Sequence, residues 1–348
     1  MEESVAPPTF AEAVLAAAVT AVGTAVAEPV AEPDGWRAPW RVLAAVARIL
    51  PYPWSEATAD AVDELRDGPG GRALPKTIDH PAVSGQVLWT RDAYGSRFGV
   101  TAAFSTPGGP DRWYLWDIDA CGYKALTVHS GYYPTSERAL AAWQAGVGPL
   151  TAAGTSFAPV DDWSLLVGLL PAEEGFLRSG GEDTGQFAEY HRSKRLAEVA
   201  ATAAGSRTRA GDSITRASVV AAAAAEFASW LAEHRADPPD PANSAELVTE
   251  LVTELADSWF SEDGVVTLYY RCSPHRVAST VLHLRNYYQD DFAASLIGLL
   301  PDWISWLATR NGTPSELVER CRPYALGEIH ADLGSDDSRP RYLARVIE

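Results

Sequence analysis

The chain has 348 residues, 47% of them hydrophobic, and a formal net charge of −18. Such a chain can bury a sizeable core, and its composition is not that of a disordered protein. The acidic charge gives no global basic footprint for duplex DNA, so contact with a nucleic acid would need a local basic patch. Three cysteines are too few for a disulfide scaffold and indicate free thiols in a reducing cytoplasm.

The N-terminal part predicts helices joined by a proline-rich hinge. The apolar run 10–27 contains Glu12 and follows acidic residues, whereas a secretory signal begins with a basic region. Alanine, its main residue, is too weakly apolar for a membrane-spanning helix. We therefore expect a packed helix in this run, no membrane contact, and further helices at 40–50 and 55–66.

The sequence pattern changes between residues 86 and 130, where short runs rich in Val, Thr, Trp and Tyr alternate with turn residues. This pattern predicts an antiparallel β-meander. The expected strands are 86–90, 97–105, 112–118 and 124–129. A helix is expected to follow at 135–146, where glycines end it.

Helical patterns dominate from residue 161 onward, with one short strand expected at 265–270. The expected helices are 161–170, 184–204, 213–235, 244–260, 274–286, 290–299, 301–310 and 314–326. Ser273 before Pro274 predicts a capped helix start, and the Thr313–Glu316 segment (TPSE) has the sequence of a capping box.

Together these patterns predict an α+β protein that is predominantly helical, with the meander and its helix joined to helical modules. We expect an N-terminal helical segment at 1–70, the meander with helices at 71–210, and a helical C-terminal module at 211–348.

One resemblance lies in the C-terminal third, over roughly residues 213–326. The segment CSPHRV at 272–277, Leu282, GLLP at 298–301 and WISW at 303–306 is similar to a helical module of uncharacterised actinobacterial proteins. The near absence of lysine among the basic residues also indicates a high-GC genome. The resemblance implies a fold module and no activity.

The most suggestive chemical signal is the segment WYLWDIDACG at 113–122. A strand that ends in D-x-D-x-x-G resembles the first motif of DEDD-type 3′–5′ exonucleases, and it implies that Asp117 and Asp119 hold Mg²⁺ or Mn²⁺ with Asp291 from a later motif. The middle motif of that family is absent. In the simpler alternative Asp117 and Asp119 are polar residues before the Cys121–Gly122 turn, and no cofactor is bound.

Two further candidates involve cysteine. Cys272 and His275 form a two-ligand clip that Cys321 and His330 would complete as a zinc site, although their spacing is unusual for one. Cys272 before a helix N-terminus could instead be a nucleophile, with His275 or His283 as its base. The simpler alternative places Cys272 in the core and His275 in solvent.

Residues 191–216 form the one basic segment of this acidic chain. They could contact a nucleic acid or an acidic partner, or they could be a solvated helix end and loop. The residues concerned are Arg192, Lys194, Arg195, Arg207, Arg209 and Arg216.

Glycine-rich phosphate loops and a nucleophile elbow are missing from the sequence. The leading hypothesis is therefore a non-enzymatic, cytoplasmic interaction or accessory protein with a protein partner. The alternatives are a metal-dependent nuclease that uses Asp117 and Asp119, and an accessory protein that binds nucleic acid through segment 191–216.

Overall fold

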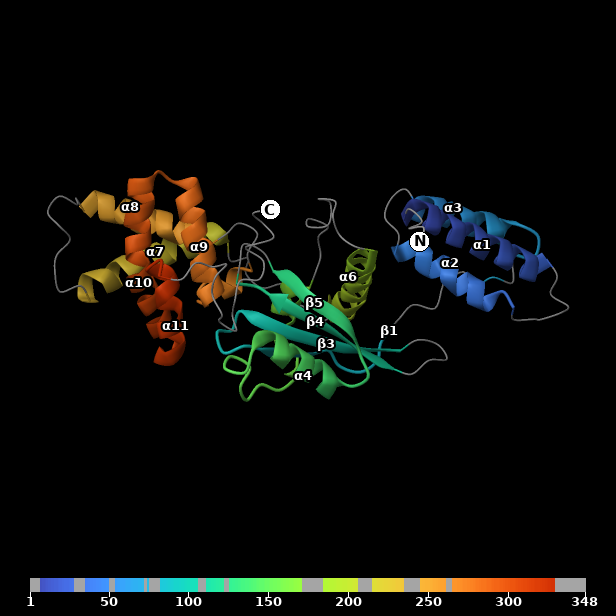
Figure 1. Cartoon of the computed structure of the whole chain (residues 1–348), viewed down its shortest axis with the longest axis horizontal. Coiled ribbons are helices and arrows are strands. Elements are labelled where there is room, and N and C mark those ends of the chain that lie inside the picture. The colour runs from blue at the N-terminus through green and yellow to red at the C-terminus, as the bar shows by residue number, and fades with distance from the viewer. Residues whose placement is uncertain are drawn as a thin grey trace, which may run out of the picture. The chain divides into compact units, whose positions relative to one another are not determined.

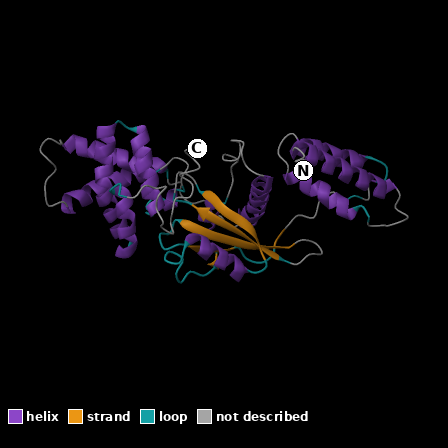
Figure 2. Ribbon diagram, viewed as in Figure 1, coloured by secondary structure: helices purple, strands orange, loops and turns teal. Residues whose placement is uncertain are grey.

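The protein is α+β and predominantly helical, as predicted, with helices α1–α11 and one antiparallel sheet (Figure 2). The fold divides into two compact units, each of which is described by itself. The computed structural model describes residues 7–27, 35–49, 54–71, 74, 82–105, 111–121, 125–170, 184–205, 215–234, 245–260 and 265–328.

The first unit contains a three-helix bundle, β1 (Ala82–Val83), the end of β3 and most of α6 (Thr184–Gly205). The bundle is formed by α1 (Pro7–Ala27), α2 (Arg37–Ile49) and α3 (Trp54–Asp67), which lie side by side (Figure 1). The alanine-rich run is thus a packed helix, as expected. The buried core of the bundle consists of Ala18, Val22, Trp40, Leu43, Val62 and Leu74.

The second unit is built on the β-sheet. Strand β2 pairs antiparallel with β3 and with β6, and β4 pairs antiparallel with β5, which confirms the predicted meander. The strand order is β5-β4-β3-β2-β6, and β1 pairs with the end of β3. The strands are β2 (Leu88–Arg91), β3 (Arg97–Ser105), β4 (Arg112–Asp119), β5 (Leu126–Tyr133) and β6 (Ala158–Pro159).

Helix α4 (Ser136–Val147) packs against the sheet (Figure 1). It begins at Thr135, whose side chain accepts a hydrogen bond from the backbone N–H of Arg138 at 3.3 Å. Its Trp143 is fully buried and lies over Gly99 of β3, where a Cβ atom would approach the indole to 2.9 Å. The lack of a side chain at residue 99 therefore permits this close packing.

Helices α7 to α11 of the second unit form a large core rich in aromatic rings, in which Phe227 meets Trp303 edge to face at 4.8 Å. Trp259, Trp303 and Trp306 are buried there, so these tryptophans are core residues. The helices of this unit are α5 (Trp163–Leu169), α7 (Arg216–His234), α8 (Ala245–Trp259), α9 (Pro274–Tyr287), α10 (Asp290–Asn311) and α11 (Ser315–Ala325).

The turn between β2 and β3 connects the sheet to this helical core. Tyr94 of the turn is a buried member of the helical core, and its hydroxyl donates to the carbonyl of Leu317 in α11 at 3.4 Å. Gly95 has a φ of +67°, and a Cβ there would meet Arg271 at 3.2 Å. Glycine at residue 95 thus permits both the left-handed backbone and the close approach of the Arg271 side chain.

The predicted strand at 265–270 is wrong. Residues Val266–Leu268 form a 3-10 turn, η2, followed by a second turn in which the N–H of Arg271 donates to the carbonyl of Leu268 at 2.9 Å. Tyr269 stacks on Phe260 at 5.1 Å in the helical core. The β-branched and aromatic residues of this run are therefore used for helix packing, which overrides their strand propensity.

The predicted break before Pro301 is also wrong, because α10 continues from Asp290 to Asn311. A proline removes one backbone hydrogen bond from a helix, but Leu299, Leu300 and Trp303 are buried around it and packing offsets that loss. Among the described helices, α10 is also the one that is long and apolar enough to cross a membrane. Its buried residues belong to the large helical core of the second unit.

The two predicted helix caps have different outcomes. Ser273 is the N-cap of α9, and its hydroxyl accepts from the N–H of Arg276 at 3.2 Å, with Pro274 in the first turn as predicted. The predicted capping box is wrong, since α11 has Pro314 as its N-cap and no side-chain cap bond. The N-cap is thus Pro314 and not Thr313, so the helix begins one residue later than the predicted capping box requires.

Substitution of Gly99 tests the packing of α4 on the sheet. We expect Gly99→Ala to lower the free energy of unfolding by about 1–3 kcal/mol, because the new methyl group would overlap the fixed ring of Trp143. Gly298→Ala is the control: its Cβ would meet nothing within 4 Å in α10, and it should stabilise by about 0.5–1 kcal/mol. Equilibrium denaturation measures both, and equal stability of Gly99→Ala and the wild type would contradict this packing.

Candidate metal centre

Two side chains of the candidate site come from the end of strand β4. Asp119 is the last residue of the strand, and Cys121 follows in the turn. The Oδ1 atom of Asp119 accepts a hydrogen bond from the backbone N–H of Cys121 at 3.0 Å, an arrangement typical of aspartate at a turn. The N–H of Ala120 donates to the carbonyl of Ser96 at 2.9 Å and fixes the turn against the β2–β3 turn.

The third side chain, His275, comes from the first turn of helix α9. The Ser273 cap and Pro274 define where this helix begins, and they place His275 one position later. His275 is buried with 6% of its surface exposed, so the expectation that it faces solvent is wrong. It is buried because its ring is directed at the end of β4.

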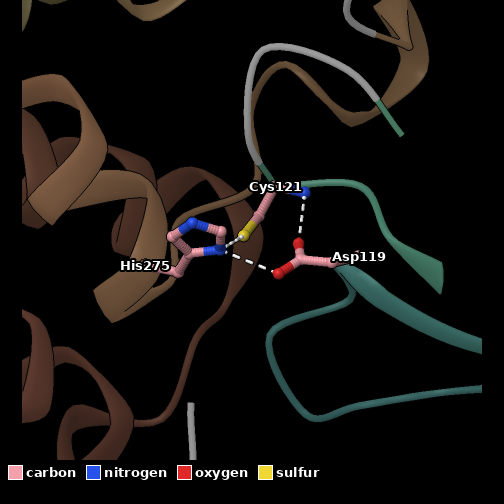
Figure 3. A group of neighbouring side chains, drawn as sticks. All are labelled: Asp119, Cys121 and His275. Atoms are coloured by element: carbon pink, nitrogen blue, oxygen red, sulfur yellow. Dashed lines mark hydrogen bonds and ion pairs between the residues drawn. The ribbon is translucent and has the colours of Figure 1, made fainter. Parts of the chain in front are cut away.

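The three side chains converge on one ring nitrogen (Figure 3). Asp119 Oδ2 lies 2.8 Å from Nδ1 of His275, and Cys121 Sγ lies 3.1 Å from the same atom. Their ligand atoms all lie within 4.8 Å of one another. Among the described residues, they are the one group of three His, Cys, Asp or Glu side chains that meets this condition.

The buried charges of the group depend on one another. Burial alone would raise the pKa of Asp119, but the neighbouring His275 holds it well below its usual range. Burial alone would lower the pKa of His275, yet Cys121 and Asp119 beside it raise that pKa well above the ordinary value. Burial raises the pKa of the Cys121 thiol, and the Asp119 carboxylate raises it further. Without an ion, the group is therefore an aspartate–histidinium pair beside a neutral thiol.

A small cavity of about 20 Å³ adjoins the three side chains, enough for one water molecule or one ion. Asp92, Ser96, Arg97 and Ser273 also line it. Asp92 Oδ1 accepts from the backbone N–H groups of Ser96 and Arg97 at 2.9 and 3.0 Å and so shapes the β2–β3 turn. Burial raises the pKa of Asp92 to about 6.

Asp117, the other predicted metal ligand, is held by arginine. Its carboxylate forms a two-pronged ion pair with Arg97, with Nε–Oδ1 at 2.9 Å and Nη2–Oδ2 at 2.7 Å. Asp117 is buried, and Arg97 is partly buried. Because the guanidinium occupies both carboxylate oxygens, this geometry is that of a structural ion pair.

The structure does not gather the predicted nuclease residues into one metal-ligand group. Asp117 and Asp119 lie on the same strand, but the first contacts Arg97 and the second contacts His275. Asp291 is exposed in the first turn of α10 and belongs to no such group among the described residues. Asp117 and Asp119 are both buried at the end of β4, and Gly122 of the turn predicted after them lies outside the described residues.

The two residues of the predicted zinc clip, Cys272 and His275, contact different side chains. Cys272 lies 4.0 Å from Cys321, sulfur to sulfur, whereas His275 points to Asp119 and Cys121. His330 lies outside the described residues. His283 is farther along α9 and stacks on Tyr287, with ring centroids 5.2 Å apart, so the described contacts pair neither predicted base with Cys272.

The predicted basic segment is spread over both units. Arg192, Lys194 and Arg195 lie on α6 in the first unit, where Arg195 pairs with Glu198 at 2.8 Å. Arg216 begins α7 in the second unit and donates to the carbonyls of Asp257 and Phe260 at the end of α8. Arg207 and Arg209 lie outside the described residues. The described members are thus not brought together on one unit.

From the sequence we considered Asp119 and His275 as ligands, but in other combinations, and Cys121 only as a turn residue. Asp119 was paired with Asp117, and His275 with Cys272, since each partner is near in sequence. The actual partners are 156 residues apart. Two local signals mark them: a D-x-C sequence at a strand end, and a histidine directly after a Ser-Pro helix start. Neither signal says that the two segments meet.

Comparison with protein families, curated proteins and solved structures finds no match to this chain. The resemblance of segment 213–326 to an actinobacterial helical module therefore stays a prediction.

Substitution of Asp92 tests the electrostatics of the cavity. The raised pKa means that the folded state favours protonated Asp92, so stability is lost as pH rises from about 4 to above 6. Asp92→Asn keeps the Oδ1 acceptor and removes this titration. Between pH 4 and pH 7 the variant should gain about 2–3 kcal/mol relative to the wild type.

Urea denaturation of both proteins at several pH values, with a chelator present, measures this difference. A stability difference between the variant and the wild type that stays constant from pH 4 to pH 7 would contradict a raised pKa of the buried Asp92.

Proposed function

We propose that this protein is a cytoplasmic zinc-binding accessory protein, in which Asp119, Cys121 and His275 hold a single Zn²⁺ ion. The observation that carries the proposal is that the carboxylate and the thiol both contact Nδ1 of His275. In a cysteine–histidine–aspartate triad the two groups contact opposite ring nitrogens. Here three potential ligand atoms instead lie within 4.8 Å of one another, a spacing that a single metal ion can bridge.

The chemistry of the donor atoms favours zinc. Thiolate sulfur, imidazole nitrogen and carboxylate oxygen are all ligands of Zn²⁺, whereas Mg²⁺ and Mn²⁺ prefer oxygen alone. Charge also balances, since a thiolate and a carboxylate together neutralise a divalent ion beside a neutral imidazole. A neutral cluster is suited to this buried position, because an uncompensated charge there would be costly.

The space at the site fits an ion after a small movement. Around a tetrahedral zinc ion, ligand atoms would be separated by about 3.4–3.6 Å, given the usual bond lengths. The sulfur–nitrogen and oxygen–nitrogen contacts of 3.1 and 2.8 Å would therefore widen by roughly half an ångström. The adjoining cavity would hold one water molecule as the fourth ligand.

The position of the site supports a structural role for the ion. Asp119 and Cys121 belong to the end of the sheet, and His275 begins a helix of the large helical core. An ion bound by all three would tie these two parts of the second unit together. The cavity has room for an ion or water but not for a substrate, which supports an accessory role over catalysis at this site.

Zinc titration of the chelator-treated protein tests the proposal. We expect one equivalent to bind and to raise the melting temperature, because the ion binds the native state only. Cys121→Ser and His275→Gln keep polar side chains but each removes one ligand, and affinity should fall at least about 100-fold. Competition with a chromophoric chelator measures the affinity.

Cys272→Ser and His283→Gln are matched controls, because Cys272 directly precedes α9 and His283 lies on it, as His275 does, but both are outside the ligand group. Both should retain wild-type affinity. Equal zinc affinity of the wild type and Cys121→Ser would contradict the proposal. A thermal shift with Mg²⁺ or Mn²⁺ that is lost in Asp117→Asn would favour the nuclease alternative instead.

A further inference from the structure

A second pair of thiols lies outside the proposed zinc site. Cys272 lies in the segment before α9 and Cys321 on α11, and their sulfur atoms are 4.0 Å apart. Together with Cys121 they are the three cysteines of the chain, and all three are reduced in this structure. The two residues are separated by 49 positions along the chain, which include α9 and α10.

We propose that Cys272 and Cys321 are a redox-active pair that a hydroperoxide converts into an intramolecular disulfide. The sulfur atoms need to approach by about 2 Å to reach a disulfide bond length, a displacement that side-chain rotation supplies. A cavity of about 10 Å³, lined by Tyr94, Ile304 and Leu317 among others, adjoins both sulfurs and leaves room for this movement.

The exposure of the two residues sets the order of the steps. Cys272 is half-buried, whereas Cys321 is 1% exposed, so the oxidant reaches Cys272 first. The Cys272 thiolate attacks the peroxide, the O–O bond breaks, and a sulfenic acid and an alcohol or water form. The Cys321 sulfur then attacks the sulfenic sulfur, the S–O bond breaks, and water leaves. Two thiols and one hydroperoxide thus give one disulfide, one alcohol or water, and one further water.

The hydrogen bonds around Cys321 permit this change. In the reduced state the Cys321 thiol donates to the carbonyl of Leu317 at 3.6 Å, a bond that the disulfide would remove. The hydroxyl of Tyr94 donates to the same carbonyl at 3.4 Å. The carbonyl therefore keeps a partner after oxidation, and no buried polar group is left unsatisfied there.

The disulfide would hold the start of α9 to α11. Helices α9 and α11 already pack against each other, so the cross-link would fix an existing contact. Closing a loop of this length restricts the unfolded chain and should raise the melting temperature by about 5 °C.

Peptide mapping of the peroxide-treated full-length protein tests the proposal, with zinc-loaded and chelator-treated samples in parallel. We expect a Cys272–Cys321 linkage in monomeric protein, a mass lower by two hydrogens, and reversal by a dithiol reductant. Cys121→Ser should form the same linkage, which keeps this test independent of the zinc site. Cys272→Ser and Cys321→Ser should lose both the linkage and the rise in melting temperature.

Two results would overturn the proposal. One is a disulfide that involves Cys121 or that joins two molecules, in place of the Cys272–Cys321 linkage. The other is oxidation of Cys272 to sulfinic or sulfonic acid without a disulfide in the wild-type protein, since this would show that Cys321 does not resolve the sulfenic acid.

Discussion

The contact between Asp119 and His275 is the interaction on which the arrangement of the second unit depends. It joins the last residue of strand β4 to the first turn of helix α9, and both side chains are buried. A buried carboxylate without a partner would be costly, so the pair fixes where the sheet can meet the helical core. Tyr94, which reaches from the β2–β3 turn to α11, adds an apolar connection between the same two parts.

The buried carboxylates among the described residues, Asp92, Asp117 and Asp119, all lie at this end of the sheet. Asp117 is neutralised by Arg97, and Asp119 by His275, whereas Asp92 accepts only backbone N–H groups and carries a raised pKa. Each carboxylate therefore has a different kind of partner. Asp92 and Asp119 line the same cavity, and Asp117 lies two residues before Asp119 on strand β4. Binding of a divalent ion by Asp119, Cys121 and His275 would release one proton from the histidinium and one from the thiol. The two positive charges of the ion would take their place.

Local sequence signals predicted most of the elements but not their partners. The strand at 97–105 and the Ser273 cap were predicted from alternation and capping chemistry, which depend on neighbouring residues. The strand expected at 265–270 and the break at Pro301 failed because packing in the helical core overrode local propensity. The candidate site could not be assembled from the sequence, since Asp119 and His275 are 156 residues apart and their proximity is a property of the tertiary fold.

X-ray absorption at the zinc edge of the zinc-loaded protein would identify the ligand atoms directly. We expect one sulfur at about 2.3 Å and the remaining ligands as nitrogen or oxygen at about 2.0–2.2 Å. The sulfur signal should vanish in Cys121→Ser and persist in Cys272→Ser. A first shell without sulfur, or one with two sulfurs that depends on Cys272 and Cys321, would contradict the assignment of Asp119, Cys121 and His275 as the zinc ligands.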